Sequence, residues 1–228
     1  IPFASPSPSR PPMLPERFRL LRRVLARRQP DLTVLMERVH KSHNFSAILR
    51  SCDATGVLDV HAVPPDEGLE LHRGTAAGSA KWLRVHRHPD VDAAVAHLRE
   101  RGFRIVAAHP ADDAVDFRRV DFTASTAVMM GAELHGLSER GLELADQAVA
   151  IPMMGMVRSL NVSVATALVL YEAQRQRAEA GMYDASRLPE EEYRRTLFEW
   201  AYPDLARRWR EEGRPYPELD PEGNLVMG

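Results

Sequence analysis

The chain has 228 residues, of which 27% are charged and 44% hydrophobic, and its formal net charge is −2. No apolar run reaches the roughly 18 residues of a membrane span. The N-terminal segment lacks the apolar core of a secretory signal. The single cysteine, Cys52, excludes an internal disulfide and a cysteine-rich zinc site, and we expect it to have a structural role. We therefore expect a cytoplasmic protein with one large domain and extensions, and neither a membrane nor a metal as partner.

The charge is distributed unevenly along the chain. Residues 1–30 contain seven arginines and one acidic residue, a net charge of +6, so the other 198 residues carry −8. A basic arm on an acidic body is a candidate contact for nucleic acid. A solvated, arginine-rich first helix explains the same residues, and the sequence leaves both readings open.

The hydrophobic pattern predicts alternating elements along the chain. Helical spacing of apolar residues predicts helices over 16–29, 44–55, 91–101, 138–145 and 160–178. Short apolar runs predict strands over 32–39, 58–63, 81–85, 103–108, 126–130 and 148–151. This alternation indicates an α/β fold whose mostly parallel sheet is flanked by helices. The last of these helices is apolar almost all round, so we expect it to be buried on every side.

The pattern also predicts the organisation of the chain into three parts. A basic N-terminal tail and helix occupy residues 1–30, and the α/β domain occupies 31–178. Residues 179–228 contain charged helical stretches that prolines interrupt, which predicts a C-terminal helical extension.

Polar residues gather at three points where strands end and helices begin, the places where ligands bind in open α/β sheets. The first group holds Asn44, a candidate helix N-cap, and Arg50. The second has Gly131 at a strand end and Glu133 in the following turn. The third is the loop before the apolar helix. Helix caps and turns explain much of each group, so residue types alone do not decide between a structural and a functional role.

Common catalytic motifs are absent from the sequence. There is no GxGxxG after a strand, no GxxxxGK[ST], no GxSxG and no HExxH. The nine histidines show no metal-binding spacing, and we expect His86 and His88 to be a surface pair.

Together, the three polar groups resemble the motifs of the SPOUT superfamily of knotted RNA methyltransferases. The segments that carry the resemblance are HNFSAILR, GAELHGLS and IPMMGMVRSLNVSVA, and the likeness runs from about Leu32 to Arg177. It implies a deep C-terminal trefoil knot in the catalytic domain at 31–178 and a homodimer formed through the knot region. It also implies S-adenosylmethionine as cofactor, and a partner subunit that covers the apolar helix.

Within the superfamily, RRQPDLTVLMERVHKSHN and LYEAQRQR are similar to enzymes that methylate the ribose 2′-OH of guanosine 18 in the tRNA D-loop. The resemblance implies that the cofactor is held by His109, Gly131, Ile151, Met153 and Leu160. It implies that the catalytic residues are Arg50, Asn44, Glu133, Ser159 and Asn161. The resemblance near the C-terminus, and the charge of the arm, give the predicted tRNA contacts Arg22, Arg23, Arg27, Arg28, Arg175 and Arg177.

Arginine is normally always protonated, so whether Arg50 acts as the base or as an electrostatic partner of an RNA phosphate stays open. Two alternatives to the tRNA reading also stay open. One is a ribosomal RNA 2′-O-methyltransferase of the same fold, and the other is a non-catalytic RNA-binding dimer.

Overall fold

The computed structural model describes residues 13–65, 80–111, 113–132 and 135–226. Contacts divide the chain into two compact units. The larger unit is Arg27–Arg187, and the smaller one joins the segment up to Ala26 with Leu188–Gly228. The N-terminal helix and the C-terminal extension, expected as separate parts, thus belong to one unit.

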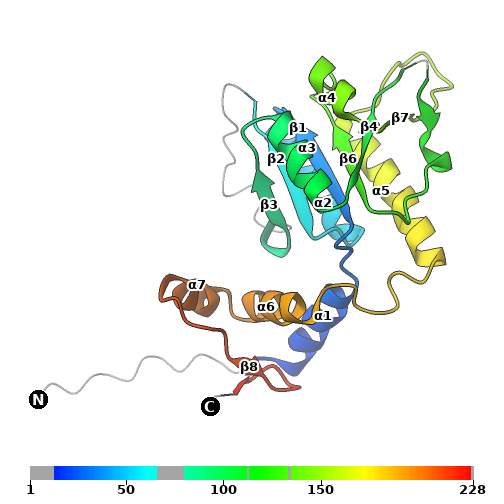
Figure 1. Ribbon diagram of the computed structural model, residues 1–228. Helices are drawn as coiled ribbons and strands as arrows, with labels where there is room; N and C mark the ends of the chain where they lie inside the picture. The colour runs from blue at the N-terminus through cyan, green and yellow to red at the C-terminus, as the bar shows by residue number, and fades with distance from the viewer. Residues whose placement is uncertain (1–12, 66–79, 112, 133–134, 227–228) are drawn as a thin grey trace, which may run out of the picture. The chain divides into compact units, whose positions relative to one another are not determined.

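A seven-stranded sheet with the order β3-β2-β1-β6-β4-β7-β5 forms the centre of the larger unit, and all of its strand pairs are parallel (Figure 1). Its strands are β1 (Leu32–Glu37), β2 (Asp59–Val63), β3 (Arg84–Arg87), β4 (Arg104–Ala108), β5 (Val115–Asp116), β6 (Thr126–Met130) and β7 (Gln147–Ala150). The predicted α/β class is therefore confirmed, and β5 is a strand that the pattern did not indicate. The trefoil knot stays a prediction.

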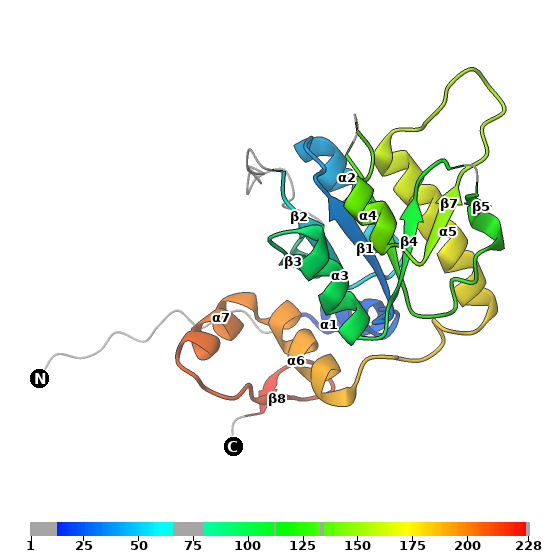
Figure 2. The ribbon, with the colours of Figure 1, turned by 45° about the horizontal axis from the view of Figure 1, so that its top comes forward.

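Helices cover both faces of the sheet (Figure 2). Side chains of α2 (Ser42–Ala54) and α5 (Val162–Glu179) pack in one core with Val34 and Met36 of β1. Side chains of α3 (Val91–Glu100) and α4 (Glu139–Leu144) pack in the other core, with Leu35. Successive residues of β1 alternate between the two cores because strand side chains point to opposite faces.

Helix α5 is buried on one face only. Its N-cap is Asn161, whose Oδ1 accepts a hydrogen bond from the backbone N of Ser163 at 2.8 Å. The opposite face leaves Val164, Leu168 and Tyr171 between 42% and 54% exposed. The prediction of burial on every side is thus wrong for a single chain, because these positions repeat at helical spacing along an uncovered face.

The smaller unit contains α1 (Pro15–Ala26), α6 (Glu190–Ala201), α7 (Pro203–Glu211) and the hairpin of β8 (Glu218–Leu219) and β9 (Leu225–Val226). Helix α1 packs on α6. In the hairpin turn, Gly223 has φ +90°, and a Cβ there would lie 2.5 Å from Phe18 Cγ. Glycine therefore permits both the turn and its close approach to α1.

The structure bears on two further predictions, one about a membrane span and one about a pair of histidines. Within the residues that the structure describes, no helix is long and apolar enough to cross a bilayer. The expected surface pair of His86 and His88 is wrong, because both rings belong to a partly buried cluster with His61 and His97.

Candidate active site

A cavity of about 380 Å³ lies beyond the carboxyl ends of the adjacent strands β6, β4 and β7. The N-terminal ends of α2 and α5 complete its wall. Many of its lining residues are apolar: Ala108, Pro110, Met130, Val149, Ala150, Ile151, Met153, Leu160, Val162, Ala165 and Val169. A cavity of this size and lining, at the strand ends of a parallel sheet, suits a small organic ligand.

All five predicted cofactor residues line this cavity, namely His109, Gly131, Ile151, Met153 and Leu160. Gly131 allows the end of β6 to touch the following turn, since a Cβ at this position would lie 2.2 Å from the carbonyl carbon of Gly136. The glycine therefore shapes the wall of the cavity through close backbone packing.

Three of the predicted catalytic residues, Asn44, Ser159 and Asn161, also line the cavity. The side-chain amide of Asn161 donates to Asn44 Oδ1 at 3.1 Å, which joins α2 to α5. The sequence predicts Asn44 as the N-cap of its helix, and this prediction is wrong. Helix α2 begins at Ser42 with Lys41 in the cap position, so Asn44 lies in the first turn and is 1% exposed.

The other two predicted catalytic residues are placed differently. Arg50 is exposed on α2, and its guanidinium makes no hydrogen bond or ion pair within the described part of the chain. It is absent from the lining of the cavity in one chain. Glu133 lies outside the described residues.

Sequence reasoning missed three cationic or titratable side chains in the lining, Lys41, His135 and Arg158. Arg158 is exposed and forms no ion pair with any described residue. The signal was present in the sequence, because each of these residues lies within one of the three polar groups. The described lining of the cavity therefore includes two cationic side chains, Lys41 and Arg158.

A buried carboxylate fixes the turn beside the cavity. Glu37, 3% exposed at the end of β1, accepts hydrogen bonds from Ser138 N at 3.0 Å and Ser138 Oγ at 2.6 Å. The Ser138 hydroxyl in turn accepts from Gly141 N at 2.9 Å and caps α4. Sequence reasoning did not single out Glu37, because a glutamate that ends a strand reads as a surface residue.

Of the predicted tRNA contacts, Arg22, Arg23, Arg27 and Arg175 are exposed. Arg175 forms ion pairs with Glu172 at 2.8 Å and Glu179 at 2.7 Å, which reduces the local positive charge.

The prediction for Arg28 and Arg177 is wrong in this structure, because both side chains are 0% exposed and no phosphate reaches them. Arg28 donates to the carbonyl of Val57 at 2.9 Å and to the carboxylate of Asp53 at 2.5 Å. Burial lowers the pKa of Arg28, and the Asp53 carboxylate opposes this shift.

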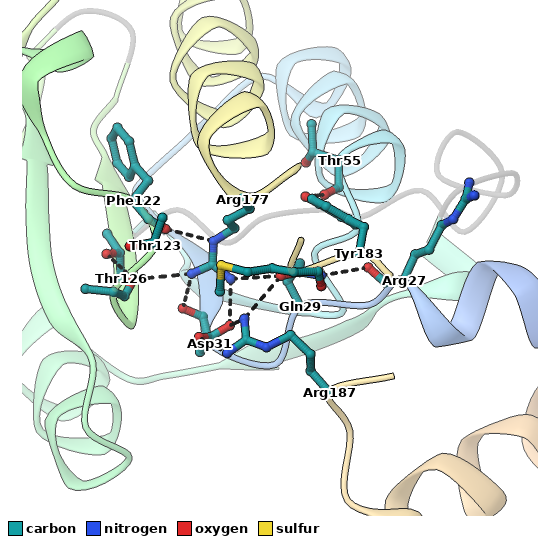
Figure 3. A network of polar contacts seen from close by, with 12 residues as sticks. Arg27, Gln29, Asp31, Thr55, Phe122, Thr123, Thr126, Arg177, Tyr183 and Arg187 are labelled. Atoms are coloured by element: carbon teal, nitrogen blue, oxygen red, sulfur yellow. Dashed lines mark hydrogen bonds and ion pairs between the residues drawn. The ribbon is translucent and has the colours of Figure 1, made fainter. Parts of the chain in front are cut away.

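Arg177 ties the C-terminal end of α5 to the amino ends of the strands (Figure 3). Its guanidinium donates to Asp31 Oδ1 at 2.6 Å, to Gln29 Oε1 at 3.0 Å and to the carbonyl of Phe122 at 2.8 Å. Arg187 donates to the other oxygen of Asp31 at 2.9 Å. Arg177 is thus a buried structural residue at the C-terminal end of α5, the end opposite the cavity.

In the described ranges, no group of three or more histidine, cysteine or acidic side chains is arranged to hold a metal ion. Cys52 is buried, and burial raises the pKa of its thiol, in line with a structural role.

A parallel α/β sheet with a cavity beyond the carboxyl ends of its strands places this chain among the open α/β proteins that bind ligands at that edge. The model of the SpoU rRNA methylase family matches residues 31–171, and that of the SpoU rRNA methylase C-terminal region matches 175–227. The chain belongs to the SpoU rRNA methylase family.

Relatives and solved structures agree with this assignment. The chain is 52% identical to the tRNA (guanosine(18)-2′-O)-methyltransferase of Escherichia coli K12, over 93% of this chain and 94% of that protein. It is similar to the A. aeolicus TrmH/SpoU tRNA modifying enzyme, with a TM-score of 0.77, 44% identity, and coverage of 83% and 97%. It is also similar to the SpoU methyltransferase AviRb of Streptomyces viridochromogenes in complex with AdoMet, with a TM-score of 0.60, 30% identity, and coverage of 66% and 62%.

Proposed function

We propose that this protein transfers a methyl group from S-adenosylmethionine to the ribose 2′-OH of guanosine 18 in the tRNA D-loop. The observation that carries the proposal is the 52% identity to a tRNA (guanosine(18)-2′-O)-methyltransferase over nearly the whole of both chains. The hydrogen-bonded Asn44–Asn161 pair in the cavity agrees with it. Methyl transfer belongs to the α/β domain at 31–178, in the cytoplasm.

The cavity fits the cofactor. Its apolar walls suit an adenine ring. His109, Gly131, Ile151, Met153 and Leu160 would hold it there. When bound, S-adenosylmethionine supplies an electrophilic methyl group on a positively charged sulfur.

The protein must position the ribose and assist loss of its proton. Methyl transfer would turn the ribose hydroxyl into a methyl ether and S-adenosylmethionine into S-adenosylhomocysteine, and the hydroxyl proton would pass to a base at the site or to water. A ribose hydroxyl is a poor nucleophile near neutral pH. Correct alignment of the reacting groups can lower the activation barrier by roughly 7–11 kcal/mol. Asn44 and Glu133 orient Arg50 and the ribose, and Ser159 and Asn161 fix the target nucleotide and the cofactor loop. Arg50 binds the phosphate beside the target ribose and promotes loss of the proton, as the base or as an electrostatic partner.

The two cationic side chains of the cavity lining suit an RNA backbone. Lys41 lies at the N-cap of α2, and Arg158 lies in the loop before α5. Because phosphate contacts give affinity and orientation rather than base readout, these two residues hold the target nucleotide at the cavity. The exposed arginines of the arm and of α5, Arg22, Arg23, Arg27 and Arg175, contact more distant phosphates.

The active form is a homodimer through the knot region. The uncovered face of α5, with Val164, Leu168 and Tyr171, supports this assembly, because a contiguous exposed apolar face on a helix marks a binding surface. A second copy of α5 would cover it.

Replacing Leu168 by glutamate should therefore convert the dimer to a monomer, since it places a charge in an apolar contact. The position is 42% exposed, so the fold should persist. Sedimentation velocity gives the mass in solution, with Ala180→Glu, at the C-cap of the same helix, as the matched control. A Leu168→Glu variant that sediments as wild type would rule out this face as the interface.

The substrate class is tested by offering two RNAs at once. The protein is incubated with radiolabelled S-adenosylmethionine, an unmodified tRNA transcript and a fragment of large-subunit ribosomal RNA. Label in the tRNA alone supports the proposal, and label in the ribosomal fragment alone supports the ribosomal alternative. No label in either, with cofactor binding shown by calorimetry, supports the non-catalytic alternative.

A further inference from the structure

Four histidine rings pack together on the α3 face of the sheet, away from the cavity. His61 of β2 lies opposite His86 of β3 in the parallel register, and their ring centroids are 4.8 Å apart. His88 directly follows β3, and its ring centroid lies 5.1 Å from that of His61. His97 of α3 lies over them, with centroid distances of 5.5, 6.4 and 5.4 Å to His61, His86 and His88. These four residues, here called the histidine cluster, join three elements.

The hydrogen bond between His61 and His88 requires one of these two rings to be neutral. Nδ1 of His61 lies 2.9 Å from Nε2 of His88, so one of these nitrogens donates and the other must be unprotonated. The Nε2 atoms of His61 and His97 are buried and have no hydrogen-bond partner in the described part of the chain. His61 is 0% exposed, so a charge on its ring would be costly.

The charged groups next to the cluster lie at its two edges, near His86 and near His88. Asp59 accepts from His86 Nε2 at 2.6 Å, with Arg84 and Arg101 nearby, and Asp90 follows β3 close to His88. Burial raises the pKa of Asp59, but its contacts with His86, Arg84 and Arg101 lower it more. The cluster therefore has one carboxylate in direct contact for four imidazoles.

Burial, then the neighbouring His86 and His88, lowers the pKa of His61 to about 3. Burial, then His97 and His86, also lowers the pKa of His88. A histidine whose pKa is lowered in the folded state binds a proton more readily when its surroundings open or unfold. Its contribution to stability is complete above the ordinary value of about 6.5 and is lost as the pH falls through the window down to about 3.

We propose that the histidine cluster is an acid-sensitive latch, which holds α3 and the edge strand β3 on β2 while His61 and His88 are neutral and releases them when these two rings take up protons. The latch is connected to the active site through α4. Arg140 of α4 pairs with Asp92 of α3 at 2.6 Å, and Arg99 of α3 donates to the carbonyl of Leu144 at 2.9 Å. Ser138, the N-cap of α4, is held by Glu37 next to the cavity wall. Release of α3 thus loosens the helix whose N-terminus supports the site.

Hydrogen exchange at pH 7.5 and pH 5.0, corrected for intrinsic rates, tests the latch on the full chain. The shift of His61 alone favours the open state by about 30-fold at pH 5.0. Amides of α3 and β3 should therefore gain exchange by at least this factor relative to β1 and β6. The gain should fall by most of this factor in His61→Gln, leaving the smaller part that His88 contributes, and the exposed His43→Gln should keep the full gain.

The quantity compared is the change with pH within one protein, so a lower overall stability of His61→Gln does not affect the result. If that variant does not fold, His97→Gln removes a neighbouring ring and should reduce the gain severalfold. An equal response in α3, β3 and the central strands would overturn the proposal, as would a wild-type response in a folded histidine variant.

Discussion

Replacing Arg50 by alanine is expected to lower the rate of methyl transfer by about 10²–10⁴-fold, the range for loss of a group that assists proton transfer. The affinity for S-adenosylmethionine should stay unchanged, because Arg50 does not line the cavity. Stability should stay within about 0.5 kcal/mol, as for other exposed substitutions. Single-turnover rates with saturating tRNA give the effect on the chemical step.

Two further variants define what Arg50 contributes. Arg50→Lys keeps the charge but loses the bidentate geometry for phosphate, so its rate should lie between wild type and alanine. Arg119→Ala removes an exposed arginine that lies in a different part of the domain, and it should behave as wild type. Near-normal turnover by Arg50→Ala would remove Arg50 from the mechanism.

Replacing Arg177 by alanine is expected to destabilise the protein by about 3–5 kcal/mol, because it leaves buried partners of a charged group unsatisfied. Asp31, Gln29 and the carbonyl of Phe122 all lose a donor. Urea denaturation measures the change. The exposed Arg175→Ala is the matched control from the same helix and should change stability by less than about 1 kcal/mol.

The same pair of variants separates structure from RNA binding. Below its unfolding transition, Arg177→Ala should bind tRNA with wild-type salt dependence, because a buried arginine releases no counterions from RNA. A stable Arg177→Ala protein with a reduced salt slope would mean that this side chain reaches the phosphate backbone after all.

Periodicity predicted the order of the main elements because each strand is a short apolar run between turns. It gave neither β5, which has two residues, nor the hairpin of β8 and β9, since such short segments carry no period. It also misread α5, because a helix with an exposed apolar face and a helix buried all round have the same composition. Only the fold shows which face the rest of the chain covers.

The motifs located most of the cavity because its walls come from three contiguous segments. The functions of the arginines were harder to predict. Arg175 and Arg177 are two residues apart, yet one is exposed and the other fully buried, since positions two apart lie on different sides of a helix. The sequence did not predict the histidine cluster for a related reason. Its members come from β2, from β3 and the residue after it, and from α3, which meet only in the folded domain.

The most direct measurement of the central claim is methyl transfer to two tRNA transcripts that differ only at guanosine 18. One transcript carries the ordinary ribose, and the other carries 2′-deoxyguanosine at that position. Radiolabelled S-adenosylmethionine is the methyl donor in both reactions. The account predicts stoichiometric label in the first transcript and none in the second. Equal label in both transcripts would contradict it, because the methyl group would then be attached elsewhere on the RNA.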